Sequence, residues 1–208
     1  MLTRILSALV LIPVVVGIVW FAPPVATKML LIVVMLVAFG ELNNLTERQW
    51  MLRVALAFLW IGLPLALLSI IRESYGPAVV MILFVLIVVS DSAQYFSGRA
   101  FGRHKLAPVI SPKKTVEGAV GGLVASMAVA PWLGSLWLPG VPMWQMATVG
   151  GVVAIAGMAG DLFESWLKRR AGVKDSGHLI PGHGGILDRI DAWLFAAPLY
   201  YAFLRLVA

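Results

Sequence analysis

The chain has 208 residues, of which 61% are hydrophobic and 12% are charged, and its mean hydropathy is +0.94. A soluble domain carries roughly 25% charged residues, so this composition excludes an ordinary soluble protein and predicts one dissolved in lipid. The absence of cysteine excludes disulfides, a thiolate nucleophile and a cysteine-based metal site. The net charge of +6 does not indicate nucleic-acid binding, because the basic residues fall in short loops between apolar segments.

About seven apolar segments are near the ~20 residues that a helix needs to cross a bilayer, and the second of them is short. The first resembles a signal peptide, with Arg4 ahead of its apolar run. Because Pro23-Pro24 and another apolar segment follow it, we interpret it as a retained helix. The expected fold class is an all-α polytopic membrane protein. Its predicted spans are 5–21, 28–41, 54–71, 77–96, 116–138, 146–166 and 186–206.

The charges of the loops predict how these spans are oriented, since loops rich in lysine and arginine stay in the cytoplasm. Most basic residues fall in alternate loops, whereas Lys28, Arg72 and Arg205 lie on the other side and residues 139–143 carry no charge. We expect the N-terminus inside, the C-terminus outside and the active site facing the cytoplasm of a bacterial inner membrane. Without internal repeats, residues 1–208 form one domain, with lipid-facing N-terminal helices in 1–76 and catalytic helices and loops in 77–208.

The loop after the fourth span contains a predicted helix start. Ser111-Pro112 places serine at the N-cap and proline at the first helical position. Lys113 and Lys114 then fall in the first turn, where cations oppose the helix dipole. A bound anion between the amides and these lysines would resolve that conflict, so we expect a phosphate-binding segment here. A basic loop that only sets the topology is the alternative.

Asp91 lies inside the fourth predicted span, without an obvious local partner. Acids buried in a membrane usually face a polar cavity or pair with a cation. We interpret Asp91 as a wall of the active site, and a structural hydrogen bond to serine or backbone groups is the alternative.

The segment 165–191 carries the strongest chemical signal, because it combines charges, histidines and glycines between two apolar spans. Asp161, Ser165 and Lys168 share one helix face. Asp188 and Asp191 share a face at the start of the last helix. Three carboxylates at the ends of two helices suit a hard cation such as magnesium, one or two ions in number. Simple pairing of Asp188 and Asp191 with neighbouring basic residues is the alternative.

The same segment contains groups that suit a phosphate. Gly184-Gly185, just before the last helix, lets backbone amides approach an anion closely. His183 is either a metal ligand or a hydrogen-bond donor to phosphate, and a donor fits a magnesium site better. His178 is interpreted as an ordinary loop residue. The cations that can neutralise phosphates are Lys168, Arg169, Lys174 and Arg189.

The pattern Ser165-x-Leu-Lys-Arg-x4-Lys-Asp-x-Gly-x2-Ile-Pro-x-His-Gly-Gly-Ile-x-Asp-Arg-Ile-Asp resembles the signature of phosphatidate cytidylyltransferases, also called CDP-diacylglycerol synthases. The stretches Ser111-Pro-Lys-Lys-Thr-x-Glu-Gly and Gly160-Asp-x-x-Glu-Ser look like further blocks of that family. Together the resemblance covers roughly residues 91–191.

The resemblance implies transfer of the cytidylyl group of CTP to phosphatidic acid, giving CDP-diacylglycerol and pyrophosphate in phospholipid biosynthesis. For this reaction the expected catalytic residues are Asp161, Asp188, Asp191 and Lys168, and the three aspartates would hold Mg²⁺. The expected partners are CTP, phosphatidic acid and membrane lipids, with a homodimer as a further option and no nucleic acid. The substrate-binding residues would be Asp91, Ser111, Lys113, Lys114, Thr115, Glu117, Ser165, Arg169, Lys174, His183, Gly184, Gly185 and Arg189.

Two alternative functions remain from the sequence. One is a related CTP-dependent membrane enzyme that acts on another lipid, such as a polyprenol kinase or a cytidylyltransferase for a different lipid phosphate. The other is an ion-coupled transporter that uses Asp91, Asp188 and Asp191. Inverted repeats would support a transporter, and the sequence shows none.

Overall fold

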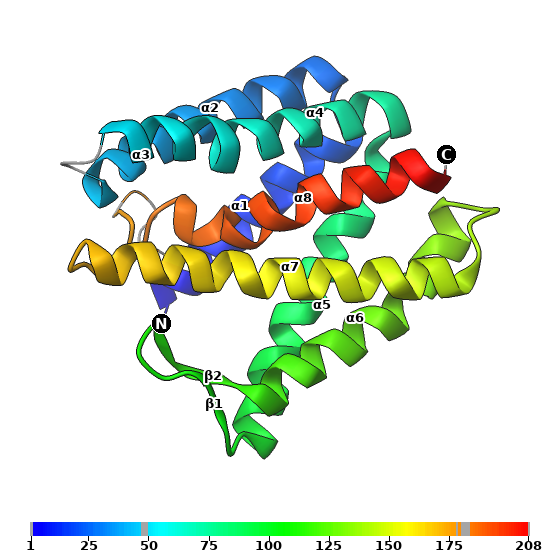
Figure 1. Ribbon diagram of the computed structural model, residues 1–208. Helices are drawn as coiled ribbons and strands as arrows, with labels where there is room; N and C mark the ends of the chain where they lie inside the picture. Colours follow the sequence, from blue (N-terminus) through cyan, green and yellow to red (C-terminus); the bar gives the residue numbers. More distant parts are fainter. Residues whose placement is uncertain (1, 47–49, 178, 180–183, 208) are drawn as a thin grey trace.

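The chain folds almost entirely into helices that run between two opposite ends of the molecule (Figure 1). A computed structural model describes residues 2–46, 50–177, 179 and 184–207. The elements are α1 (Leu2–Phe21), α2 (Pro24–Leu45), α3 (Trp50–Ala55), the π-helix η1 (Leu56–Gly62), α4 (Leu63–Tyr75), α5 (Pro77–Phe101), β1 (Lys105–Ala107), β2 (Ser111–Thr115), α6 (Val116–Trp137), α7 (Met143–Arg170) and α8 (Leu187–Val207).

The predicted fold class is confirmed. Among the residues that the structure describes, six helical stretches are long and apolar enough to cross a membrane, and the shorter apolar helix 9–21 within α1 corresponds to the first predicted span. Large apolar side chains on several helices face outward, among them Leu36, Phe58 and Val124. A soluble protein rarely exposes such surfaces, whereas lipid tails cover them in a membrane.

The third span is one continuous helical stretch, Trp50–Tyr75, interrupted by the π-helical segment η1. Pro64 is the second residue of α4, which follows η1. A proline inside a helix has no N–H to donate and its ring collides with the carbonyl one turn earlier. The wider turn, in which the Leu63 N–H donates to the Phe58 carbonyl, accommodates that collision without ending the helix.

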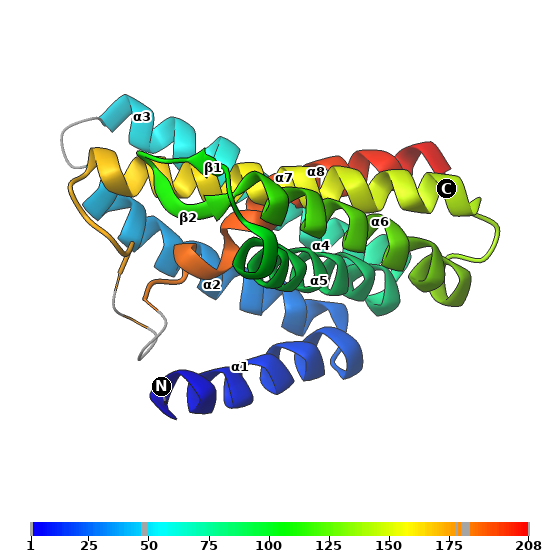
Figure 2. The same ribbon diagram turned by 90° about the horizontal axis from the view of Figure 1, so that it is seen from below.

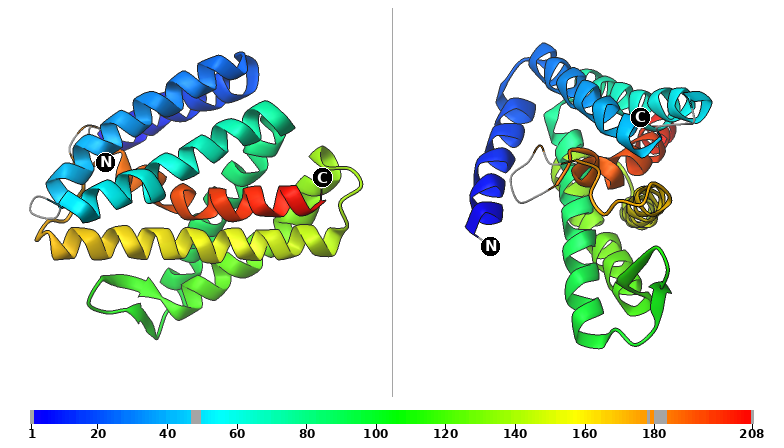
Figure 3. Two further views of the ribbon diagram at one scale, coloured as in Figure 1. Left: turned by 45° about the horizontal axis from the view of Figure 1, so that its top comes forward. Right: turned by 90° about the vertical axis from the view of Figure 1, so that its left-hand side faces the viewer.

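The helices pack in an order that places α7 and α8 at the centre. Helix α6 lies between α5 and α7, while α4 covers α8 and α2 packs against α4 (Figures 1 and 3). Helix α1 lies at the edge of the bundle against α2 and α5 (Figure 2). The buried Arg72 of α4 holds the end of α1, because its guanidinium donates to the terminal carbonyls of Val19 and Ala22.

The charged loops gather at one end of the bundle. The start of α1, the β1–β2 hairpin and the described residues between α7 and α8 lie at this end, whereas the turn between α6 and α7 and the end of α8 lie at the other (Figures 1 and 3). The alternation predicted for the spans therefore brings the two basic loops to the same end.

The helix start predicted at Ser111 is wrong. Residues Ser111–Thr115 form strand β2, which pairs antiparallel with β1, and α6 begins at Val116. Thr115 is the N-cap, and its hydroxyl oxygen accepts the Gly118 N–H at 3.1 Å. Lys113 and Lys114 therefore lie on a strand, and the expected conflict between these lysines and a helix dipole does not arise.

Candidate active site

Three aspartates from three different helices face a common region at the charged end of the bundle. Asp91 is on α5, Asp161 on α7 and Asp191 on α8. Asp161 is close enough to the other two for their negative charges to repel one another. Lys114 of β2 offsets part of this charge, because its Nζ lies 2.6 Å from Asp161 Oδ2. The hairpin thus brings Lys114, from the loop after the fourth predicted span, onto Asp161, near the end of α7 that lies at the charged end of the bundle.

Gly160 allows α7 and α8 to approach closely at this point. A Cβ atom at Gly160 would lie 2.3 Å from the backbone oxygen of Asp191, well inside van der Waals contact. Small residues permit such backbone approach between membrane helices. Because Asp161 follows Gly160 directly, this contact sets how near the two aspartates stand.

We expect Gly160→Ala to lower the thermal stability of the protein and to reduce its activity. The added methyl group must push α8 away from α7, and overpacking of this kind costs about 1–3 kcal/mol. Gly157→Ala is the matched control one turn earlier, since its Cβ would lie 3.4 Å from Ala192 Cβ, an ordinary contact. Unfolding midpoints in detergent compare the two variants. Equal midpoints would refute the close approach.

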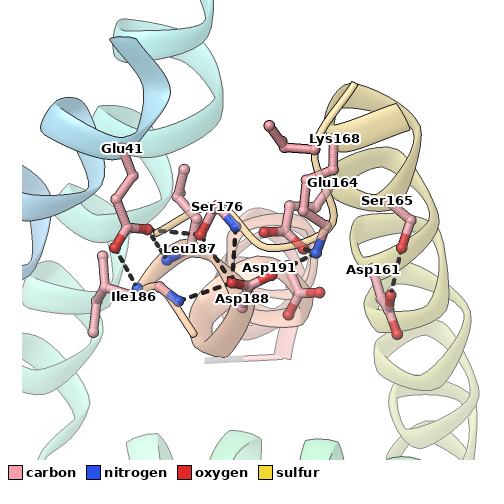
Figure 4. A network of polar contacts seen from close by, with 12 residues as sticks. Glu41, Asp161, Glu164, Ser165, Lys168, Ser176, Ile186, Leu187, Asp188 and Asp191 are labelled. Atoms are coloured by element: carbon pink, nitrogen blue, oxygen red, sulfur yellow. Dashed lines mark hydrogen bonds and ion pairs between the residues drawn. The ribbon is translucent and has the colours of Figure 1, made fainter. Parts of the chain in front are cut away.

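Lys168 lies buried between two carboxylates. Its Nζ donates to Glu164 Oε2 at 2.6 Å and to Asp188 Oδ1 (Figure 4). Both acids are themselves largely removed from solvent, with side chains 1% and 7% exposed. Two buried carboxylates therefore depend on one ammonium group, and this arrangement ties the end of α7 to the start of α8.

The second oxygen of Asp188 organises the segment before α8. Asp188 Oδ2 accepts the Ser176 N–H at 3.0 Å and the Gly185 N–H at 2.9 Å, and the Ser176 hydroxyl lies 3.0 Å away. Gly184 has a φ of +82°, the left-handed region that favours glycine. Asp188 thus uses its two oxygens within the protein, on Lys168 and on this loop.

Gly184-Gly185 was predicted to offer backbone N–H groups to a phosphate. In the structure, carboxylates of the protein itself accept N–H groups of this turn. The Gly185 N–H donates to Asp188, while the N–H groups of Ile186 and Leu187 donate to Glu41 of α2. These amides are satisfied by acids that the helix N-terminus favours.

The described part of the chain contains no group of three histidine, aspartate or glutamate side chains that could hold a metal ion by themselves. Asp161 and Asp191 are near enough for their charges to interact, and Asp161 also pairs with Lys114 and Ser165. Asp188 is engaged as described above. Mg²⁺ is commonly bound by one or two carboxylates together with waters and substrate phosphates. The oxygen donors of Asp161 and Asp191 fit an ion held in this shared way.

The other residues predicted to bind substrate are distributed unevenly. Ser165 donates to Asp161 at 3.3 Å, inside the site. Glu117 accepts from the backbone and ring of His104, which fastens the hairpin to α6.

The remaining predicted residues that the structure describes are exposed or carry structural roles. Arg169 donates to the Val173 carbonyl and is exposed, as are Lys113 and Lys174. Ser111 starts β2, Thr115 caps α6, and His183 and His178 lie outside the described residues.

Two acids of this region were not predicted as site residues. Glu164 is 1% exposed and pairs with Lys168. Glu41 is 7% exposed and contacts the loop before α8 from a different part of the sequence. The signal for Glu41 was its charge at the end of an apolar span, since acids in that position tend to be functional.

An apolar cavity of about 440 Å³ adjoins the acidic cluster. Helices α1, α2, α4, α5 and α8 line it, mainly with leucine, isoleucine and valine. Among its described lining residues, the polar or charged ones are Thr27, Asp91 and Arg189. Asp91 therefore belongs to both the acidic cluster and the cavity, so a charged and an apolar environment meet at this side chain.

Comparisons with known proteins identify the family of this chain. A sequence model described as the cytidylyltransferase family matches residues 48–207. The chain is 44% identical over 128 residues to the phosphatidate cytidylyltransferase of Staphylococcus saprophyticus, which covers 61% of this chain and 49% of that protein. It is 45% identical over 139 residues to that of Brucella suis, which covers 65% of this chain and 51% of that protein.

The chain spans about half the length of the curated relatives it matches. The matched region includes Asp91, Asp161 and Asp191 together with Lys114, whereas Glu41 lies before it. The family predicted from the segment 165–191 is confirmed by these matches. This chain belongs to the cytidylyltransferase family.

Proposed function

We propose that this chain transfers the cytidylyl group of CTP to phosphatidic acid, giving CDP-diacylglycerol and pyrophosphate. The observation that carries the proposal is the junction at Asp91 between an acidic cluster with a lysine and an apolar cavity. A lipid phosphate needs both environments, because its chains require an apolar surface and its headgroup a polar one. Relatives named phosphatidate cytidylyltransferase support this assignment.

In the proposed reaction an oxygen of the lipid phosphate attacks the α-phosphorus of CTP. The new phosphorus–oxygen bond forms as the bond between the α- and β-phosphates breaks, and pyrophosphate leaves with the electron pair. Lys114 would lie against the phosphates of CTP. Ser165 and Lys168 would keep Asp161 and the start of α8 in place. Such a transfer depends on positioning and charge stabilisation and needs no covalent enzyme intermediate.

Asp161 and Asp191 would hold a magnesium ion in this site. When bound, the ion supplies positive charge that neutralises phosphate oxygens and the leaving pyrophosphate. The two carboxylates come from neighbouring helices held close by Gly160.

The acyl part of phosphatidic acid would occupy the apolar cavity. Arg189 lies among its lining residues and is exposed, at the start of α8. A guanidinium group matches the geometry of a phosphate by two parallel hydrogen bonds. The lipid phosphate would therefore lie between Arg189 and the acidic cluster.

The charged end of the bundle would face the cytoplasm of a bacterial inner membrane. We expect a cysteine at Val109, 87% exposed at the hairpin turn, to resist a membrane-impermeant maleimide in intact cells until they are permeabilised. A cysteine at Pro139, at the opposite end, should react in intact cells. The chain has no native cysteine, so the background is clean. The reverse pattern would contradict the orientation and separate the site from cytoplasmic CTP.

We expect Lys114→Gln to raise the KM for CTP about tenfold to a hundredfold, because a hydrogen bond to a charged group contributes about 1.5–3 kcal/mol. Steady-state kinetics with varied CTP measure this change. Lys105→Gln is the matched control, since it removes the same charge from an exposed position of the hairpin. An unchanged KM in Lys114→Gln, or an equal rise in both variants, would exclude direct contact between Lys114 and CTP.

The proposal is tested with the purified chain, CTP, magnesium and phosphatidic acid in mixed micelles. Pyrophosphate and CDP-diacylglycerol should form in equal amounts. Parallel reactions with a polyprenol or a polyprenyl phosphate examine the alternative acceptors. If one of these lipids yields product and phosphatidic acid yields none, that lipid and not phosphatidic acid is the acceptor.

A further inference from the structure

We propose that Glu41, on α2 and before the region matched by the family, is a positioning residue for the active site. It holds the described residues before α8, 176–177 and 184–186, in the arrangement that keeps Asp188 on Lys168 and presents Asp191. The inference rests on the proposed function, because the reaction defines which arrangement is productive. The contacts of Glu41 themselves do not depend on it.

Glu41 uses both oxygens on this segment. Oε1 accepts the Ile186 N–H at 2.8 Å, and Oε2 accepts the Leu187 N–H at 2.9 Å and lies 2.8 Å from the Ser176 hydroxyl (Figure 4). The side chain is 7% exposed, so water competes little for these bonds. A negative charge at the first N–H groups of a helix is also favoured by its dipole.

The segment leaves space for this carboxylate. A Cβ atom at Gly185 would lie 2.3 Å from Glu41 Oε2, and one at Gly177 would lie 2.7 Å from Oε1. Both glycines stand beside the residues that donate to Glu41. The glycines of this segment thus serve an internal carboxylate that comes from a distant helix.

The contacts of Glu41 continue into the acidic cluster. The Ser176 hydroxyl lies between Glu41 and Asp188, and Asp188 pairs with Lys168 of α7. Asp191 is one turn further along α8. Because Glu41 fixes the first residues of α8, it also fixes the side chain of Asp191 relative to Asp161. Its oxygens are engaged on the chain itself, so Glu41 acts through these residues and not on the substrate.

The test is Glu41→Gln in the full chain, which keeps the shape but removes the charge. In either orientation its NH₂ group faces one of the two backbone N–H donors. We expect turnover to fall about tenfold to a hundredfold with the KM for CTP little changed, since a misplacement of about 1 Å can have an effect of that size. Glu73→Gln is the matched control, because Glu73 is an exposed acid at the other end of the bundle, paired with Lys28.

A second measurement does not require activity. Amide hydrogen exchange of the peptide covering 184–190 should be faster in Glu41→Gln than in the unaltered chain and unchanged in Glu73→Gln. Unchanged exchange and turnover in Glu41→Gln would overturn the proposal. An unaltered chain inactive on CTP, with faster exchange in Glu41→Gln, would reject the proposed function and leave the anchoring by Glu41 intact.

Ser176→Ala provides an independent variant if Glu41→Gln does not accumulate. It removes only the hydroxyl between Glu41 and Asp188, and turnover should fall several-fold with the KM for CTP unchanged. Because the two residues act on the same segment, the double variant should lose less than the product of the two separate losses. Normal turnover in Ser176→Ala, or a double variant whose losses multiply, would contradict the link from Glu41 to Asp188.

Discussion

Asp161→Asn and Asp191→Asn should each lower turnover at least about a hundredfold, the loss expected when a group that stabilises transition-state charge is removed. Each variant keeps the shape of the side chain and removes one of the two charges available to a magnesium ion. Membrane insertion and yield should stay near those of the unaltered chain, because neither residue holds the segment before α8.

Glu73→Gln serves as the control for removing an acid from a helix of this protein without touching the site. Single-turnover and steady-state rates with CTP and phosphatidic acid compare the variants. Near-normal turnover in Asp161→Asn or Asp191→Asn would remove that residue from the metal site and from the account of the chemistry.

Asp188→Asn should behave differently from these two variants. It breaks a buried ion pair with Lys168 and weakens the contacts to Ser176 and Gly185. Removing one partner of a buried pair destabilises a protein by about 3–5 kcal/mol. We therefore expect a lower unfolding midpoint in detergent along with lost activity. Normal stability with lost activity would instead return Asp188 to direct contact with the metal or substrate.

Excess chelator should abolish the activity, and added magnesium should restore it. Calcium should restore little, because it prefers a looser shell of six to eight oxygen ligands at longer distances. Initial rates across a series of buffered free metal concentrations measure both effects. Full activity in excess chelator would refute the magnesium assignment without affecting the acceptor proposal.

The sequence was sufficient to predict the spans, but it grouped Asp161 and Asp191 with Asp188, which the structure engages with Lys168 and the segment before α8. Hydropathy over about 20 residues reports burial in lipid directly. Asp91 stood out because acids in such segments are rare, whereas Asp161 and Asp191 stood out by their spacing on helix faces. The helix start at Ser111 was mispredicted because capping residues describe only the local chain. The pairing of β2 with β1 decided its conformation, and that contact joins residues on both sides of a turn.

The carboxylates that accept the N–H groups around Gly184-Gly185 could not be predicted for a similar reason. Gly184-Gly185 indicates that an anion approaches the backbone, but not which anion. Asp188, from the following turn, accepts the Gly185 N–H. Glu41, from more than a hundred residues upstream, accepts the next two N–H groups, those of Ile186 and Leu187. The second contact depends on how α2 packs near α8, which no local pattern contains. The same limit applies to Glu164, whose role follows from its burial beside Lys168.

The most direct test of the proposed function follows the phosphates of CTP. The purified chain is incubated with magnesium, phosphatidic acid and CTP labelled either in the α- or in the γ-phosphate, and the lipid fraction is counted. Cytidylyl transfer predicts that the α-label enters the lipid and the γ-label leaves as pyrophosphate. A lipid that carries the γ-label would identify a CTP-dependent kinase, and a lipid that carries neither label would contradict the account.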